Sequence, residues 1–279
     1  MDPIYLSSKC IEVFRTHLEQ EEKSTATIEK YMRDVGKFVQ YAQGRIVTKE
    51  LSIAYKQYLI DQQYAVRSIN SMLASMNCFL KFMGLQEGRV KQLRQQREVF
   101  CPEEKELTRS EYLRMLDAAK NDPQISLVMQ AICATGIRVS ELQYFTVENV
   151  QHGIITVSCK SKLRTVFLPE KLRKSLLQYA EATQVHSGCI FLSKNGTPLD
   201  RNYIWSKMKK LCTNANVNPS KVFPHNLRKL FARSFYTIEK DIVQLADILG
   251  HSSIETTRIY IMTSGTEHRK KMEQLDLVI

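Results

Sequence analysis

Glycine and proline are scarce in this sequence. Its 279 residues include 10 glycines and 7 prolines, about half of the roughly 12% combined share that is usual in globular proteins. Because both residues interrupt regular structure, their scarcity predicts long elements, most of them helices. No run approaches the roughly 18 consecutive apolar residues that a membrane span requires, so we expect no membrane segment.

Paired cysteines are also absent. Seven cysteines stand singly along the chain without a CxxC pair, which excludes a zinc ribbon visible in the sequence and argues against a disulfide framework. The N-terminus becomes charged and amphipathic too early for a signal peptide. We therefore expect reduced thiols and a cytoplasmic location.

The motifs of several common enzyme classes are missing. The sequence contains no GxxxxGKS or GxGxxG phosphate loop and no HExxH. Carboxylates do not cluster at metal-binding spacing, so a two-metal nuclease would be hard to build. Acidic residues are in the minority, because 40 Lys and Arg oppose 29 Asp and Glu for a net charge of +11. This excess favours a polyanionic partner, either nucleic acid or an anionic membrane surface.

Helical periodicity is what the sequence does contain, and it falls into two blocks. Four amphipathic segments with apolar residues three and four positions apart occupy the first block, at about 5–20, 28–39, 48–62 and 66–83. Residues 91–106 lack such periodicity and join the basic run KQLRQQR to an acidic stretch, as a linker would. The basic run is either a solvated helix end or a phosphate contact. We therefore place an N-terminal helical domain at 1–90, a linker at 91–106 and a second domain at 107–279.

The second domain opens with a helix-start signal and contains one hairpin. Thr108 and Glu111 have the spacing of a capping box. Two runs rich in β-branched and aromatic residues, 154–158 and 165–168, flank the basic turn CKSKLR and predict a β-hairpin. Helices are expected at about 109–120, 124–135, 139–145, 170–183, 200–214, 225–236, 241–249 and 253–262. The fold class is thus mainly α with a small β-hairpin, followed by a tail at 263–279.

Three short motifs of the second domain carry cations. In PHNLR, the proline precedes a helical first turn in which free N–H groups near His225 attract an anion, and Arg228 lies on the same face. In TGIRVSEL, Arg138 stands at the head of a helix. In LGH, a glycine ends one helix and places His251 in the turn before the helix of Tyr260. Read singly, each motif also fits an ordinary ion pair or turn.

In this order and spacing, the motifs resemble those of the tyrosine recombinases, the phage integrase family. The matching stretches are TGIRVSEL, the hairpin lysine in VSCKSKLR, HNLR, LGH and TTRIY. The resemblance covers residues 107 to about 262, and the N-terminal helices look like that family's core-binding, SAM-like domain. It implies a site-specific recombinase, of Xer-like or mobile-element type, that cleaves and rejoins DNA through a 3′-phosphotyrosine. Integration, excision and resolution by sequential strand exchange are all compatible with it.

The resemblance also assigns catalytic roles. The residues that match the family's machinery are Arg138, Lys160, His225, Arg228, His251 and Tyr260. The tyrosine would attack the phosphate, the arginines would clamp its oxygens, and the lysine would protonate the departing 5′ oxygen. The first histidine would exchange a proton with the tyrosine, and the second would donate to the phosphate. Because the covalent link keeps the phosphodiester energy, neither metal nor ATP is expected.

Some positions leave alternatives open. The glycines that usually flank the family's lysine are Cys159 and Ser161 here, so Lys162 is an alternative to Lys160. Glu141 either orients its neighbours or forms a helix-face ion pair. Three further tyrosines are rivals for the nucleophile by residue type, although none follows an LGH turn: Tyr144, Tyr203 and Tyr236.

DNA binding is the other expectation that the resemblance brings. The two domains would clamp a duplex, and four protomers would form the recombining tetramer. Candidate DNA contacts, which would make affinity strongly salt-dependent, are Lys91, Arg94, Lys162, Arg164, Arg201 and Lys207. The tail would dock on a neighbouring protomer or pack on its own chain, and a partner recombinase or directionality factor is compatible with this scheme. The alternatives are a type IB-like topoisomerase and a DNA-binding protein without catalysis.

Overall fold

The computed structural model describes residues 6, 8–94, 103–159, 162–262, 269 and 272–275 of the chain. The chain divides into two units, residues 1–97 and 98–279, and each unit has a hydrophobic core of its own. Among the described residues, no helix has the length and apolar character needed to cross a bilayer.

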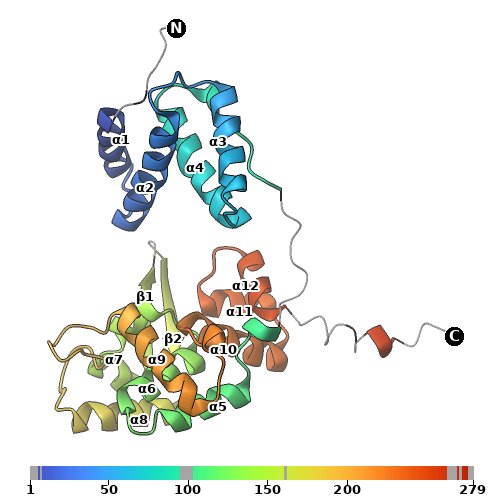
Figure 1. The fold of residues 1–279 in the computed structure, drawn as a ribbon. Helices are drawn as coiled ribbons and strands as arrows, with labels where there is room; N and C mark the ends of the chain where they lie inside the picture. Colours follow the sequence, from blue (N-terminus) through green and yellow to red (C-terminus); the bar gives the residue numbers. More distant parts are fainter. Residues whose placement is uncertain are drawn as a thin grey trace. The chain divides into compact units, whose positions relative to one another are not determined.

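In the described part of the first unit, four α-helices pack together (Figure 1). They are α1 (Ser8–Gln20), α2 (Thr25–Ala42), α3 (Lys49–Asp61) and α4 (Val66–Phe82), followed by a short 3₁₀ helix, η1 (Gln86–Gly88). Their apolar stripes meet around Phe14, Phe38 and Phe79, which are fully buried. Phe14 meets Phe79 edge to face with ring centroids 5.2 Å apart, a favourable geometry for aromatic pairs. The four amphipathic segments expected from the sequence are therefore confirmed.

The chain that leaves this unit stays attached to α4 for several residues. The side chain of Asn77 donates to the carbonyl of Val90 at 2.8 Å and accepts from its N–H at 2.9 Å. Asn70 makes the same pair of bonds with Leu93, at 2.9 and 2.7 Å. An amide side chain that satisfies both backbone groups of another residue replaces a backbone partner, so the start of the basic run is held on α4.

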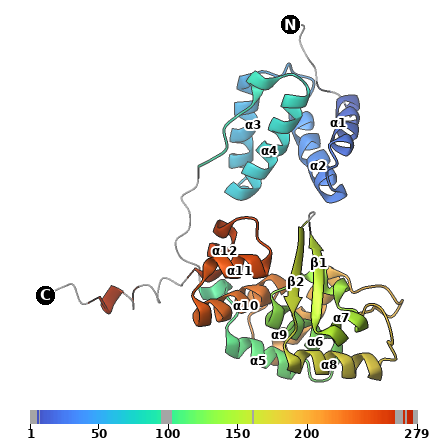
Figure 2. The same ribbon diagram turned by 180° about the vertical axis from the view of Figure 1, so that it is seen from behind.

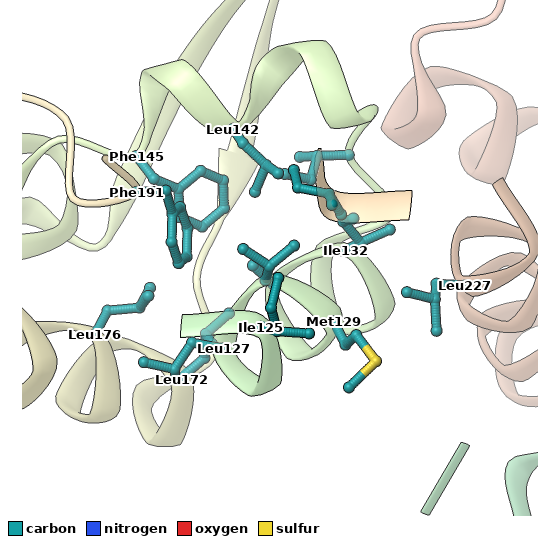
Figure 3. Packing of buried hydrophobic residues seen from close by; sticks show 14 of the residues in the cluster. Ile125, Leu127, Met129, Ile132, Leu142, Phe145, Leu172, Leu176, Phe191 and Leu227 are labelled. Carbon is teal, nitrogen blue, oxygen red and sulfur yellow. The ribbon is translucent and has the colours of Figure 1, made fainter. Parts of the chain in front are cut away.

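The second unit is mostly helical and surrounds the apolar helix α6 (Pro123–Thr135). Its other elements are η2 (Glu103–Lys105), α5 (Arg109–Ala118), η3 (Val139–Tyr144), α7 (Val147–His152), β1 (Ile154–Cys159), β2 (Lys162–Phe167), α8 (Glu170–Ala182), α9 (Arg201–Ala215), η4 (Pro219–Lys221), α10 (Pro224–Glu239), α11 (Ile242–Leu249) and α12 (Ile254–Ile261). Figure 3 shows Ile125, Met129 and Ile132 of α6 among side chains from η3, α8 and α10. Most residues of α6 are apolar and seven of its residues are buried, so α6 lies at the centre of this core.

The two strands form an antiparallel hairpin (Figure 2), and the side chains on one of its faces are buried. Ile155 pairs with Val166 and Val157 pairs with Arg164 in the register. The side chains of Ile155, Val157 and Val166 are buried, whereas Leu163 on the opposite face is 73% exposed. Alternation along a strand places Arg164 on the buried face.

A small separate core fixes helices α11 and α12. Leu245 and Leu249 of α11 pack with Ala232 of α10 and Tyr260 of α12. Helix α12, which carries Tyr260, is therefore packed on both α10 and α11.

The fold class expected from the sequence, mainly helical with one small hairpin, is confirmed. Two local predictions were wrong. Helix α7 was missed, although Thr146 caps it by accepting from the N–H of Asn149 and Gly153 ends it in the left-handed region. Strand β2 begins at Lys162 rather than Thr165, because pairing with β1 continues to Cys159 and overrides the polar composition of this stretch.

Candidate active site

Arg138 reaches the site from the turn between α6 and η3. Gly136 ends α6 with φ +64°, a conformation that suits glycine, and a Cβ there would stand 2.4 Å from the ring of Phe231. The N–H of Arg138 donates to Glu141 at 2.7 Å, and its Nη1 donates to the other oxygen of that carboxylate at 2.9 Å. Its Nη2 donates to the carbonyl of Gly250 at 3.1 Å. The side chain stays 32% exposed, so part of the guanidinium faces solvent.

Arg228 is the buried cation of the site. It lies in the second turn of α10 with an exposed fraction of 2%. Its Nη1 donates to the carbonyl of Gly136, and its Nη2 donates to the carbonyl of Leu249 at 2.6 Å. These carbonyls stand at the C-terminal ends of α6 and α11, where the helix dipole favours a positive charge. Arg228 therefore joins three helices through one guanidinium.

His251 contacts the guanidinium of Arg228. Gly250 ends α11 with φ +63°, and the imidazole that follows has its Nε2 3.0 Å from Nη2 of Arg228 and its Nδ1 2.9 Å from Oγ1 of Thr257. Because a guanidinium can only donate, Nε2 accepts, and the ring proton of neutral His251 is on Nδ1. In this tautomer His251 has no N–H directed at a substrate. The donation to phosphate expected from the sequence therefore requires a second proton on the ring.

Tyr260 is held between the two histidines. It is 6% exposed, and its ring meets the rings of His225 and His251 edge to face, with centroids 5.0 Å apart in both pairs. Its hydroxyl is 3.5 Å from Nδ1 of His225, the outer limit of a hydrogen bond. The structure thus brings the tyrosine, two histidines and two arginines together from four separate segments.

A cavity of about 720 Å³ opens beside these residues. Its lining includes Arg138, His225 and Arg228, together with Arg201 and Trp205 of α9. The wall therefore combines four cationic or imidazole groups with an aromatic ring. Among the described residues, no group of three or more His, Cys, Asp or Glu side chains is arranged to hold a metal ion.

Positive charge and burial lower the basicity of both histidines. His225 keeps some exposed surface, but burial of the rest and the charges of Lys229, Arg228, Arg201 and Arg138 lower its pKa to about 4. Burial, then Arg228 and Arg138, lowers the pKa of His251 to about 4 as well. Burial and Arg138 lower the pKa of Arg228 to about 10, which leaves it charged at neutral pH. The free site is therefore cationic through its arginines and carries neutral imidazoles.

These pKa values predict a titration that depends on the ligand. In the free chain, NMR should show His225 and His251 gaining a proton only near pH 4, far below the ordinary value of 6.5. Since the unfolded chain takes up these protons first, each histidine reduces stability as the pH falls from 6.5 toward 4. A bound phosphodiester should raise both pKa values, because an anion favours the imidazolium.

The signals can be assigned with His225→Gln and His251→Gln, and the DNA complex can be measured with Tyr260→Phe. Titration of either histidine in the free chain at or above pH 6.5 would contradict the prediction.

The expected DNA contacts differ in their exposure and in their partners within the protein. Arg201 is exposed at the cavity, and Lys91 and Arg94 are exposed on the first unit. Lys207 forms an ion pair with Asp122 at 2.9 Å, which offsets part of its charge. The expected place of Arg164 in the hairpin turn is wrong, because it lies in β2. Its side chain, a candidate DNA contact, is 10% exposed and bonded inside the protein.

The structure describes the side chain of neither hairpin lysine. Lys160, the expected acid for the 5′ oxygen, lies outside the described residues, as does most of the tail at 263–279. Lys162, the alternative acid and an expected DNA contact, is described only in its backbone, at the start of β2.

The sequence analysis did not find Thr257, which orients His251. It is fully buried and stands three residues before Tyr260 on α12, so both side chains lie on one face of the helix. That spacing is the only sequence signal for it.

Comparison with known proteins points in one direction. The model of the Phage integrase family matches residues 105–266, and that of the N-terminal SAM-like domain of phage integrases matches residues 11–87. The chain is 29% identical to tyrosine recombinase XerA of Pyrococcus furiosus, over 98% of this chain and 96% of that protein. It is 27% identical to tyrosine recombinase XerD of Halalkalibacterium halodurans, over 91% and 93%.

Solved structures agree in fold. A crystal structure of XerA recombinase is 25% identical with a TM-score of 0.55, covering 97% of this chain and 99% of that one. A lambda integrase tetramer bound to a Holliday junction reaches a TM-score of 0.75 at 16% identity, covering 93% and 78%.

Proposed function

Because the chain belongs to the phage integrase family, it is a tyrosine-type site-specific DNA recombinase, and we propose that Tyr260 is its nucleophile. The observation that supports this role is the convergence at the Tyr260 hydroxyl. That oxygen lies 3.5 Å from Nδ1 of His225. The ring of Tyr260 also contacts His251, which is hydrogen-bonded to Arg228. A nucleophile, a neutral base and a buried cation thus occupy one site.

The reaction follows from these positions. The oxygen of Tyr260 forms a bond to the phosphorus while the bond from phosphorus to the 5′ oxygen breaks. The phenolic proton passes to His225, whose pKa of about 4 keeps it neutral and able to accept. Lys160 gives a proton to the departing 5′ oxygen. A 5′ hydroxyl of the partner strand then attacks the phosphotyrosine, and the proton transfers run in reverse.

Arg138 and Arg228 stabilise the charge that grows on the non-bridging oxygens. Arg138 has a solvent-facing edge, and both arginines line the cavity. Their carbonyl and carboxylate partners fix them before the substrate arrives, which is what electrostatic stabilisation of a transition state requires. The scheme needs neither a metal ion nor ATP, since the bond energy passes from the phosphodiester to the phosphotyrosine and back.

DNA binding and oligomerisation are part of this function. Further elements of the proposal are a tetramer at two paired sites, an optional partner recombinase or directionality factor, and a cytoplasmic location. The lambda integrase tetramer on a Holliday junction supports the first of these elements for a related fold. Neither alternative, a topoisomerase or an inactive DNA-binding protein, draws support from the relatives.

The test begins by selecting a site from random-sequence duplexes that bind the chain. Two duplexes with that site and different labels are then incubated with the protein in EDTA and without ATP. Recombinant products are expected, and digestion of complexes trapped on a nicked duplex should yield a nucleotide attached to the Tyr260 peptide. Relaxation of supercoiled DNA without exchange would favour the topoisomerase instead. A nucleotide on another residue would overturn the assignment of Tyr260.

A further inference from the structure

Arg164 is a charged residue on the buried face of the hairpin, where an apolar residue is usual. On β2, the buried face carries Arg164 and Val166, and the exposed face carries Leu163, Thr165 and Phe167. Leu163 is 73% exposed, while the arginine beside it is 10% exposed. A buried charge next to an exposed leucine contradicts the local pattern of a half-buried strand. Such departures are expected where function requires a particular side chain.

The guanidinium of Arg164 is bonded to two elements far away in the sequence. Its Nη2 donates to the carboxylate of Glu141 in η3, and its Nη1 donates to the carbonyl of Ile248 at 2.5 Å near the end of α11. Gly250 lies directly against its stem, because a Cβ there would stand 2.6 Å from Cδ and 2.9 Å from Nε of Arg164. The arginine therefore fills the space that the glycine leaves.

These bonds close a ring around the catalytic arginine. Glu141 is 2% exposed and accepts from Arg164, from the N–H of Arg138 and from its Nη1. Arg138 in turn donates from Nη2 to Gly250, two residues beyond the carbonyl that Arg164 holds. Arg164 therefore fixes both groups that hold Arg138, the carboxylate of Glu141 and the turn at Gly250.

Resting on the proposed function, we propose that Arg164 is a positioning residue for strand cleavage. It holds Arg138 through Glu141, and it holds the turn that carries His251 through Ile248. It does so from the strand that follows the hairpin lysine, so the hairpin and the phosphate clamp are fixed by one side chain. In this role it contacts no DNA, and its positive charge compensates the negative charge of the buried Glu141 carboxylate.

The consequence for catalysis is specific. A displacement of about 1 Å in a catalytic group can reduce a rate about 100-fold, and loss of Arg164 releases both anchor points of Arg138. Affinity for DNA should remain, because the guanidinium is bonded to Glu141 and Ile248 inside the protein and is only 10% exposed. A backbone contact would behave differently, since removing it weakens binding and reduces the salt dependence by about 0.9 per phosphate.

The experiment compares Arg164→Lys and Arg164→Met with Arg173→Lys on a nicked duplex bearing the selected site. Arg173 is a matched control, because it pairs with Glu170 and donates to the carbonyl of Gln151 at 3.0 Å, outside the site. We expect single-turnover cleavage to fall about 100-fold in Arg164→Met and less in Arg164→Lys, which retains the charge. Affinity and its salt slope should match wild type, and the control should cleave normally.

Two further measurements distinguish a positioning role from a purely structural role. Unfolding is measured for every variant, and rates are compared only for the folded fraction. Glu141→Gln combined with Arg164→Met should cost less than the sum of the single effects, because both act through one contact. Weaker binding with a smaller salt slope, or full cleavage by folded Arg164→Met, overturns the proposal. If wild type itself forms no covalent product, the proposed function fails instead.

Discussion

A Tyr260→Phe chain should bind its DNA site normally and form no covalent product. The substitution removes only the hydroxyl, and the ring keeps its edge-to-face contacts with His225 and His251. Because the lost contact to His225 is as long as 3.5 Å, stability should change by less than about 1 kcal/mol. Removing a nucleophile can cost about 10⁶-fold in rate, so no adduct should be seen on a nicked duplex. Denaturing electrophoresis of labelled DNA measures it.

Tyr236→Phe is the matched control for this experiment. Tyr236 packs against the same small core as Tyr260 and was one of the rival tyrosines, yet within the described part of the chain no hydrogen bond places its hydroxyl at the site. Its variant should form adduct at the wild-type rate. Adduct formation by Tyr260→Phe, together with its loss in Tyr236→Phe, Tyr144→Phe or Tyr203→Phe, would move the nucleophile elsewhere.

Arg228→Lys should lose both activity and stability. An ammonium is a point charge and cannot reproduce a planar fork that satisfies two carbonyls and His251 at once. The carbonyls of Gly136 and Leu249 would then lie buried with incomplete partners, at a cost of about 2–4 kcal/mol in unfolding free energy. Cleavage should fall about 10³-fold, the effect of losing one preorganised donor to the transition state. Urea unfolding and single-turnover cleavage measure the two losses.

Arg114→Lys provides the comparison. Arg114 also donates to two carbonyls at a helix end, those of Ala215 at 2.9 Å and Asn216 at 3.2 Å. Its replacement should reduce stability without slowing cleavage by the folded protein. If Arg228→Lys, corrected for its folded fraction, cleaves within tenfold of wild type, then Arg228 is a structural residue rather than part of the phosphate clamp.

The sequence was sufficient to locate most helices and the motifs of the site. Caps such as Thr108 with Glu111 act over three residues, so their signals are local and can be read directly. The motifs could be recognised together only through their order along the chain. Their distances in space depend on the packing of α6, α10 and α11, which no local signal specifies.

Arg164 shows why other contacts of the site could not be predicted from the sequence. Its neighbours CKSKL are polar and basic enough to suggest a turn, and propensity alone places it at the surface. The register that pairs it with Val157 turns it inward, toward a carboxylate 23 residues earlier and a carbonyl 84 residues later. A buried ion pair between distant segments leaves no periodic trace in the sequence.

The long-range bonds of Arg228 also determine when the enzyme becomes competent during its synthesis. The arginine needs the carbonyl of Gly136, 92 residues before it, and that of Leu249, 21 residues after it. Chains emerge from the ribosome N-terminus first, so α10 is made before its second anchor exists. Helix α12, with Tyr260, follows later still. A growing polypeptide thus acquires the proposed phosphate clamp before the proposed nucleophile, and one that ends before α12 lacks Tyr260.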